Sequence, residues 1–174
     1  MKHFVRFFVV TLSLLICTHS LAEQKVVVLD MKFVLNQSKA GKGAQDFLKE
    51  SFKSNQKKFA DIEKKLKKEE ADLQEKRTIL SKEEYTKKAD SLRKKVIDYQ
   101  SQRRAALDKI ANQRAEARKT LLKKLDPILD TYIKENDIFL VIDKKEMLGG
   151  KPEADITKII VEKLNKELPS LDLK

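Results

Sequence analysis

The chain has 174 residues, and its 38 Lys and Arg residues against 27 Asp and Glu residues give a net charge of +11. Its only cysteine, Cys17, and its two histidines, His3 and His19, lie close to the N-terminus, and the chain has no tryptophan. The remaining residues therefore lack the side chains needed for disulfides, thiol nucleophiles, imidazole bases and Cys/His metal sites.

Residues 1–22 have the features of a cleavable secretory signal. Two basic residues precede an apolar run at residues 9–17, and small side chains follow at Ser20 and Ala22, the positions that a signal peptidase reads. We expect cleavage between Ala22 and Glu23, which leaves a chain of net charge +9 without cysteine. A membrane anchor is the alternative, but the apolar run is short for spanning a bilayer. Export without disulfides is compatible with the bacterial periplasm.

The mature chain begins with a predicted strand at residues 25–30, a continuous apolar run that is rich in β-branched residues and ends in Asp. Such a run is typical of a strand buried on both faces, with a short buried helix as the alternative. We place this strand and a short helix in a first segment, residues 23–38.

Residues 39–135 have the seven-residue spacing of a coiled coil, but the series mix apolar with polar residues, so the predicted seam is incomplete. This segment holds 27 basic and 17 acidic residues, net +10, and therefore all the excess positive charge of the mature chain. The series are Phe52, Phe59, Leu66, Leu73 and Leu80; Leu48, Asn55, Ile62, Glu69 and Lys76; Tyr85, Leu92, Tyr99, Ala106, Gln113 and Thr120; Ala89, Val96, Arg103, Ile110, Ala117 and Lys124.

A capping box divides this segment into two helices. Ser81 can accept a hydrogen bond from the backbone near Glu84, and the Glu84 side chain can reach back, which marks a new helix start. We expect a turn near residues 80–81 and an antiparallel hairpin whose legs extend roughly 60 Å each at about 1.5 Å per residue. One uninterrupted parallel coiled-coil rod is the alternative.

Pro127 interrupts the pattern of the return leg, because it has no N–H to donate to the helix. Asp126 and Pro127 also resemble the cap and first residue of a fresh helix, so we expect a kink or joint at residues 126–127. Beyond it, a second apolar run at residues 138–143 predicts another buried strand. A Gly-Gly-Lys-Pro loop follows, and then an amphipathic helix at residues 155–168.

The two flanking segments, residues 23–38 and 136–174, are small for an independent core, and the edges of their strands need cover. We therefore expect several chains to pool their strands into a shared body, from which residues 39–135 project as an arm. The residues expected in this shared core are Val26, Val28, Leu29, Phe139, Leu140, Val141 and Ile142.

Two stretches at the ends carry a family resemblance: VVVLDMKFVLNQSKAGKGA near the start, and FLVIDKKEML with PEADITKIIVEKLN near the end. They resemble the Skp/OmpH family of periplasmic chaperones. The resemblance implies an α+β fold, mostly α, with a long antiparallel coiled-coil hairpin on a small β-rich trimerisation body. It also implies a homotrimeric, ATP-independent holdase that encloses unfolded outer-membrane β-barrel proteins between its arms.

Basic residues of the arm are the candidate binding groups. Positive charge attracts acidic unfolded chains, and the densest cluster on the first helix is Lys57, Lys58, Lys64, Lys65, Lys67 and Lys68. The resemblance further implies a lipopolysaccharide site among basic arm residues. Its candidates are Arg103, Arg104, Arg114, Lys123 and Lys124, with a solvated charged face as the alternative.

Three rival functions remain from the residues alone. A structural coiled-coil protein lying on an anionic lipid surface explains length and charge but not the incomplete seam. An enzyme would depend on carboxylates, Lys, Tyr and Ser, and no paired constellation of these is recognisable, so we predict a non-enzyme. A nucleic-acid-binding rod conflicts with export. We also expect no cofactor, because Gly41-Lys42-Gly43 lacks the spacing of a phosphate-binding loop.

Overall fold

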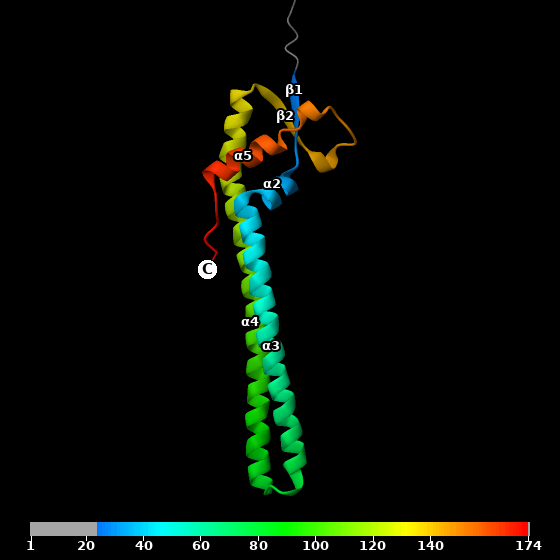
Figure 1. Cartoon of the computed structure of the whole chain (residues 1–174), viewed down its shortest axis with the longest axis vertical. Helices are drawn as coiled ribbons and strands as arrows, with labels where there is room; N and C mark the ends of the chain where they lie inside the picture. The colour runs from blue at the N-terminus through cyan, green and yellow to red at the C-terminus, as the bar shows by residue number, and fades with distance from the viewer. Residues whose placement is uncertain (1–23, 174) are drawn as a thin grey trace, which may run out of the picture.

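The computed structural model describes residues 24–173, so the predicted cleavage between Ala22 and Glu23 lies outside the described residues. Figure 1 shows a long helical hairpin that projects from a small unit of strands and short helices. The predicted fold class, α+β and mostly α, is confirmed. The elements are β1 (Lys25–Leu29), α2 (Met31–Gln37), α3 (Lys39–Glu75), η1 (Lys76–Thr78), α4 (Lys82–Glu135), β2 (Ile138–Asp143), η2 (Lys144–Glu146), η3 (Pro152–Ala154) and α5 (Thr157–Glu167).

The hairpin consists of α3 and α4, which lie side by side along the arm (Figure 1). The capping box forms at its tip, where Ser81 Oγ accepts from the Glu84 N–H at 3.3 Å and Glu84 Oε2 accepts from the Ser81 N–H at 3.1 Å. The turn is longer than predicted, because α3 ends at Glu75 and η1 together with residues 79–81 completes the reversal.

Pro127 does not start a new helix. α4 runs without interruption from Lys82 to Glu135 with Pro127 inside it, so the predicted fresh start at Asp126 is wrong. Leu125 before the proline is fully buried, and Ile128, Leu129, Tyr132 and Ile133 after it pack against the core of the body. Apolar packing on both sides of Pro127 outweighs the loss of one helical hydrogen bond.

The body is built around the parallel pairing of β1 with β2. Parallel strands require a crossover connection, and here the crossover consists of α2 and the whole arm. Val27 and Leu29 of β1 lie in one buried cluster with Val34 of α2 and with Ile160 and Leu164 of α5. The sheet therefore joins β1, which precedes the arm in the chain, to β2, which follows it.

β2 is not buried on both faces within one chain, which corrects the prediction made for it. Phe139 is 63% and Leu140 47% exposed, and Val26, the partner of Leu140 in the sheet register, is 42% exposed. The exposure is concentrated in β2, which pairs with β1 alone among the described residues, whereas Val27, Val28 and Leu29 of β1 are buried.

The junction between α2 and α3 is fixed by hydrogen bonds to α5. Thr157 Oγ1 accepts from the Asp30 N–H at 2.8 Å, and Asn165 Oδ1 accepts from the Lys39 N–H at 2.6 Å, so α5 contacts both ends of α2. The buried Ser38 caps α3 by accepting from the Gly41 N–H at 3.2 Å. These bonds set the direction in which α3 leaves the body.

Gly41 tests this junction. An added Cβ at Gly41 would overlap the backbone carbonyl oxygen of Leu35, whereas a Cβ at Gly43 would meet nothing within 4 Å. We expect Gly41→Ala to lower the free energy of unfolding by about 1–3 kcal/mol, because the obstacle is backbone. The matched variant Gly43→Ala should raise it by about 0.5–1 kcal/mol through lower unfolded-state entropy. Urea denaturation at one protein concentration measures both, and equal effects of the two substitutions would contradict the packing of α2 on α3.

Asp155 links the loop after β2 to β1 and α5. Its carboxylate accepts hydrogen bonds from Lys144 Nζ at 2.7 Å and from the Thr157 N–H at 2.9 Å, and the next residue, Ile156, donates its N–H to the Val28 carbonyl at 2.9 Å. Partial burial by itself raises the pKa of Asp155, but the hydrogen bonds from Lys144 and Thr157 outweigh it and lower the pKa from 3.8 to about 2.

Since the folded-state pKa of Asp155 lies below the unfolded-state value, the ionised form stabilises the fold above about pH 4, and this stabilisation is lost as the pH falls toward 2. At pH 6 we expect Asp155→Asn to be less stable than the parent by on the order of 1 kcal/mol, after allowance for solvent screening. The difference should close by about pH 2. Denaturation curves at both pH values test this, and a difference that persists unchanged in acid would contradict it.

Candidate functional site

The arm buries its apolar side chains near the body and leaves them half exposed toward the tip. Leu48 and Phe59 of α3 and Ile110, Ala117 and Leu121 of α4 are buried. Between residues 60 and 109, which the structure describes throughout, no residue is fully buried, and the apolar seam positions there are only partly buried. This agrees with the incomplete seam that the heptad series predict.

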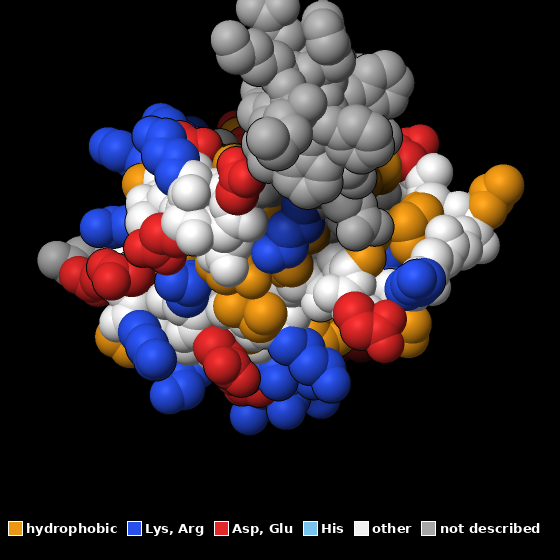
Figure 2. Space-filling view, turned by 90° about the horizontal axis from the view of Figure 1, so that it is seen from above, with side chains coloured by type: hydrophobic (Ala, Val, Ile, Leu, Met, Phe, Trp, Pro, Cys, Tyr) orange, Lys and Arg blue, Asp and Glu red, His pale blue; other side chains and the backbone are white. Residues whose placement is uncertain are grey.

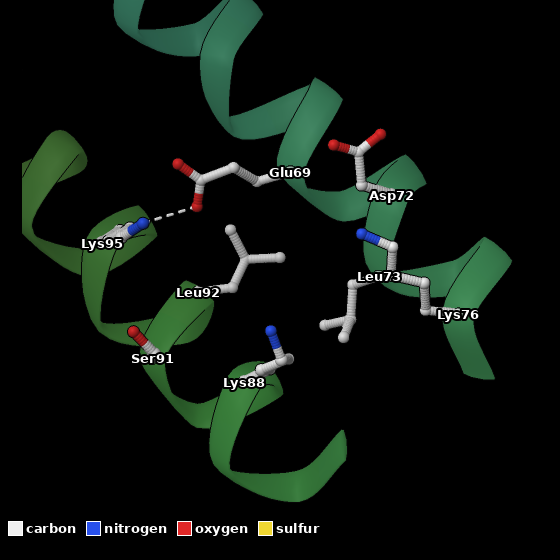
Figure 3. Close-up of a pocket in the computed structure, with 8 residues that line it drawn as sticks. All are labelled: Glu69, Asp72, Leu73, Lys76, Lys88, Ser91, Leu92 and Lys95. Carbon is white, nitrogen blue, oxygen red and sulfur yellow. Dashed lines mark hydrogen bonds and ion pairs between the residues drawn. The ribbon is translucent and has the colours of Figure 1, made fainter. Parts of the chain in front are cut away.

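Polar contacts accompany the apolar ones along the outer seam. Lys95 Nζ of α4 contacts Glu69 Oε2 of α3 at 2.6 Å, and Figure 3 shows Leu73 and Leu92 between the helices beside this pair. The surrounding hollow of about 340 Å³ is also lined by Lys76 and other polar residues. Because the ion pair is half exposed, it contributes little to stability. The tip is therefore held more weakly than the base.

Two larger hollows open along the same seam closer to the body. One has a volume of about 800 Å³ and lies where α2, α3 and α4 meet, and the other has a volume of about 390 Å³ beside the edge-to-face pair of Phe59 and Tyr99, whose ring centres are 6.0 Å apart. Small side chains are among the lining residues, Ala44 and Ala117 in the first hollow and Ala106 in the second.

The six lysines proposed to attract clients are all exposed on α3. Lys67 contacts Glu63 at 2.8 Å one helical turn away, and the hydrogen bond from Lys67 lowers the pKa of the Glu63 carboxyl. Lys58 Nζ lies 5.4 Å from the centre of the Phe59 ring. The set is Lys57, Lys58, Lys64, Lys65, Lys67 and Lys68.

The five lipopolysaccharide candidates are exposed on α4, but the structure does not bring them to one place. Arg103 lines the smaller hollow and Arg114 the larger one, whereas Arg104, Lys123 and Lys124 line neither. The set extends along the helix for about 30 Å at 1.5 Å per residue. Their common role in lipopolysaccharide binding stays a prediction.

The predicted core residues of the body divide into two groups. Val28 and Leu29 are buried within the single chain, and Val141 and Ile142 are half-buried. The remaining three, Val26, Phe139 and Leu140, are exposed on the sheet. Viewed along the long axis from the body end, hydrophobic side chains reach the surface among Lys and Arg side chains (Figure 2).

Two further kinds of site were searched for among residues 24–173. None of the helices in this range is both long and apolar enough to cross a membrane. Nor does this part of the chain gather three or more His, Cys, Asp or Glu side chains in a way that could hold a metal ion.

Comparison with known proteins identifies the family. Residues 25–164 match the family model described as outer membrane protein (OmpH-like). The chain belongs to the OmpH-like family. A curated relative, the Skp-like protein of Pseudomonas aeruginosa, is 26% identical over 169 residues, which cover 95% of this chain and 98% of the relative. The resemblance carried by the two ends of the sequence is thus confirmed.

The fold recurs in a solved structure. The crystal structure of a putative outer membrane chaperone (OmpH-like) from Caulobacter crescentus superposes with a TM-score of 0.79 and covers 89% of this chain and 92% of that one. At 18% sequence identity, this likeness shows the shared fold of OmpH-like proteins.

The hollows along the seam are the feature that sequence reasoning missed. The heptad series marked Ala106 and Ala117 as seam positions, but periodicity alone does not tell whether a small side chain is compensated by a large one on the facing helix. The sequence signal available was the presence of small residues near the seam of both helices, such as Ala44 and Ala117, which line the same hollow.

Proposed function

We propose that this protein is an ATP-independent holdase, which binds unfolded outer-membrane β-barrel proteins in the periplasm between its basic arms and keeps them from aggregating. Membership of the OmpH-like family supports a chaperone role. The observation that carries the more specific proposal is the arm itself, a well-formed helical hairpin that leaves several large apolar side chains exposed and buries none of its residues fully between residues 60 and 109.

Large apolar side chains are exposed along the whole arm. Each can contribute only a small part of the roughly 1.5–3 kcal/mol that full burial of such a side chain provides. Many weak contacts together retain an unfolded chain while each one breaks and reforms easily, so the client stays mobile. The exposed arm residues are Phe47, Phe52, Ile79, Ile97 and Leu107.

The charge of the arm supports capture. A net charge of +10 on residues 39–135 attracts acidic chains over about the Debye length and speeds their association. Release needs no nucleotide in this mechanism, because folding of the client into a membrane removes the apolar segments that the arm holds.

We also propose a homotrimer that assembles through the body. A two-stranded sheet is marginal by itself, and the exposed Val26, Phe139 and Leu140 form an apolar surface beside the edge of β2, which has no second strand next to it in residues 24–173. Strands from other copies would cover this surface and pair with this edge. The arms then remain free to enclose a client.

Substitutions at Leu140 and Val28 test assembly and folding separately. Leu140 is half exposed in the single chain, so Leu140→Asp should leave the helices folded but dissociate the trimer. Val28 is buried within the chain, and Val28→Asp should unfold the body, because an unpaired buried carboxylate costs several kcal/mol. Ile97→Asp, an equally exposed change on the arm, is the control and should stay trimeric. Sedimentation and circular dichroism measure the outcome.

A variant with residues 60–100 replaced by a short turn should also sediment as a trimer. If it is monomeric and well folded, or if Leu140→Asp remains trimeric, the arms rather than the body hold the copies together.

Dilution of a denatured β-barrel protein into buffer with the mature protein tests the holdase function, with light scattering reporting aggregation and native mass reporting the complex. Suppressed scattering without ATP is expected. Reversing the six-lysine cluster defined above to Glu changes the arm from +10 to −2 with little loss of helix propensity. Association with an acidic client should then slow by about tenfold or more at low salt, and the deficit should shrink as salt rises.

The matched control replaces the same six lysines by Arg, which keeps the charge. If the Glu variant remains trimeric and captures acidic clients as fast as the parent, the charge does not serve capture. If neither the parent nor the Arg variant suppresses aggregation but both bind anionic vesicles, the role of a structural envelope protein explains the arm better than the holdase function does.

A further inference from the structure

The two hollows near the body are adjacent, because Phe52 lines both of them, and we call the two together the seam groove. We propose that the seam groove is the primary docking site for client segments, and that it takes an extended segment whose apolar side chains alternate with polar ones and whose flanks are acidic. This proposal rests on the holdase function proposed above and adds the place and the pattern of recognition.

The floor of the groove is apolar and the space above it is open. Ala44, Leu48 and Ile110 line it near the body, and Phe59 and Tyr99 line it farther out. Phe52 is 48% and Leu107 47% exposed at its sides, although both residues line a hollow. An apolar or aromatic side chain that enters the groove would complete the contacts that these residues lack within their own chain.

The charges around the groove favour acidic flanks. Four cationic side chains line it against two carboxylates, and one of the carboxylates, Glu63, already accepts hydrogen bonds from Lys67 at 2.8 Å and from the Tyr99 hydroxyl at 3.3 Å. The charge that remains available to a ligand is therefore positive, and carboxylates beside the apolar side chains of a client would pair with it. The cations are Lys49, Arg103, Arg114 and Arg118, and the second carboxylate is Asp46.

The length of the groove matches a single strand. From Ala44 to Glu63 the groove follows α3 over 19 residues, or about 30 Å at 1.5 Å per residue. An extended chain covers that distance with about nine residues. Membrane-spanning β-strands have about this length and alternate apolar with polar side chains, so one face of such a segment can enter the groove while the other stays in water.

A second copy of the arm is a less suitable occupant of the groove, and the hollow near the tip is a less suitable docking site. The arm of a second copy carries the same net charge of +10, so like-charge repulsion opposes its entry. The hollow near the tip has a lining of mainly charged residues with an internal Glu69–Lys95 ion pair, and it offers an incoming apolar segment less to contact (Figure 3).

Photo-crosslinking locates the docked segment. A benzoylphenylalanine at Gln56 would lie in the lining of the groove, whereas one at Ser101, two residues after Tyr99, would lie on the opposite side of α4. With an unfolded β-barrel client, Gln56 should crosslink several-fold more than Ser101. Equal yields from a complex that still suppresses aggregation would overturn the groove but not the holdase. Crosslinks from Gln56 to a second copy would also overturn it, by showing a subunit interface. Failure to form any client complex would overturn both.

A peptide tests the pattern. The probe is a short fluorescein-labelled peptide in which Phe and Leu alternate with Thr between acidic ends, and its control has the same composition with the apolar residues in one block. We expect the alternating peptide to bind more tightly. The double variant Phe52→Ser/Leu107→Ser should weaken it by about tenfold, and the control variant Leu148→Ser/Ile159→Ser, which removes exposed apolar side chains of the body, by less than about twofold. Equal affinity for both peptides, or equal losses in the two variants, would overturn the proposal.

Discussion

The parallel pairing of β1 with β2 is the constraint on which the rest of the molecule depends. Parallel neighbours cannot be joined by a tight turn. After β1 the chain must therefore leave the sheet and return to the end at which β1 began before β2 can start. In most folds a single helix makes this crossover and packs on the sheet. Here the crossover is extended into a hairpin, and the packing on the sheet is left to α2, α5 and the last turns of α4.

This arrangement separates stability from function along one helix. The end of α4 near the body lies in the core, with Leu121 and Leu125 buried, while its other end at the tip has no buried side chain. Long helices in proteins depend on tertiary packing for most of their stability. Because α4 is continuous through Pro127, the anchored end supports the rest, and the outer seam need not be well packed for the arm to form.

Local signals in the sequence predicted the elements and their order well. The capping box at Ser81 and Glu84 predicted the hairpin because both partners lie within one turn of helix. The heptad series predicted the incomplete seam because the repeat is also a local property, which is read from the spacing of residues within each helix. Pro127 was misjudged because its effect depends on what the neighbouring turns touch, and their contacts with the core come from distant parts of the chain. The exposure of Phe139 was missed because a run of apolar residues does not tell which chain covers it.

The candidate site was harder to predict from the sequence than the fold was. Exposed lysines were recognisable as a cluster in the sequence, but the groove is lined by residues of α2, α3 and α4 together, and only the structure shows which of them meet. Heptads give the period of each helix and not the alignment between antiparallel partners.

Charge and apolar exposure on the arm depend on each other. An exposed apolar surface of this length would promote self-association, and the net charge of +10 opposes it between copies while it attracts acidic partners. Repulsion between arms weakens with salt, whereas the apolar contacts do not, so in the trimer proposed above a neutral arm is expected to close on its neighbours and to cover its exposed apolar side chains. In the proposed holdase, the positive charge therefore has a second role besides solubility, which is to keep the incompletely packed arm open to acidic chains other than its own.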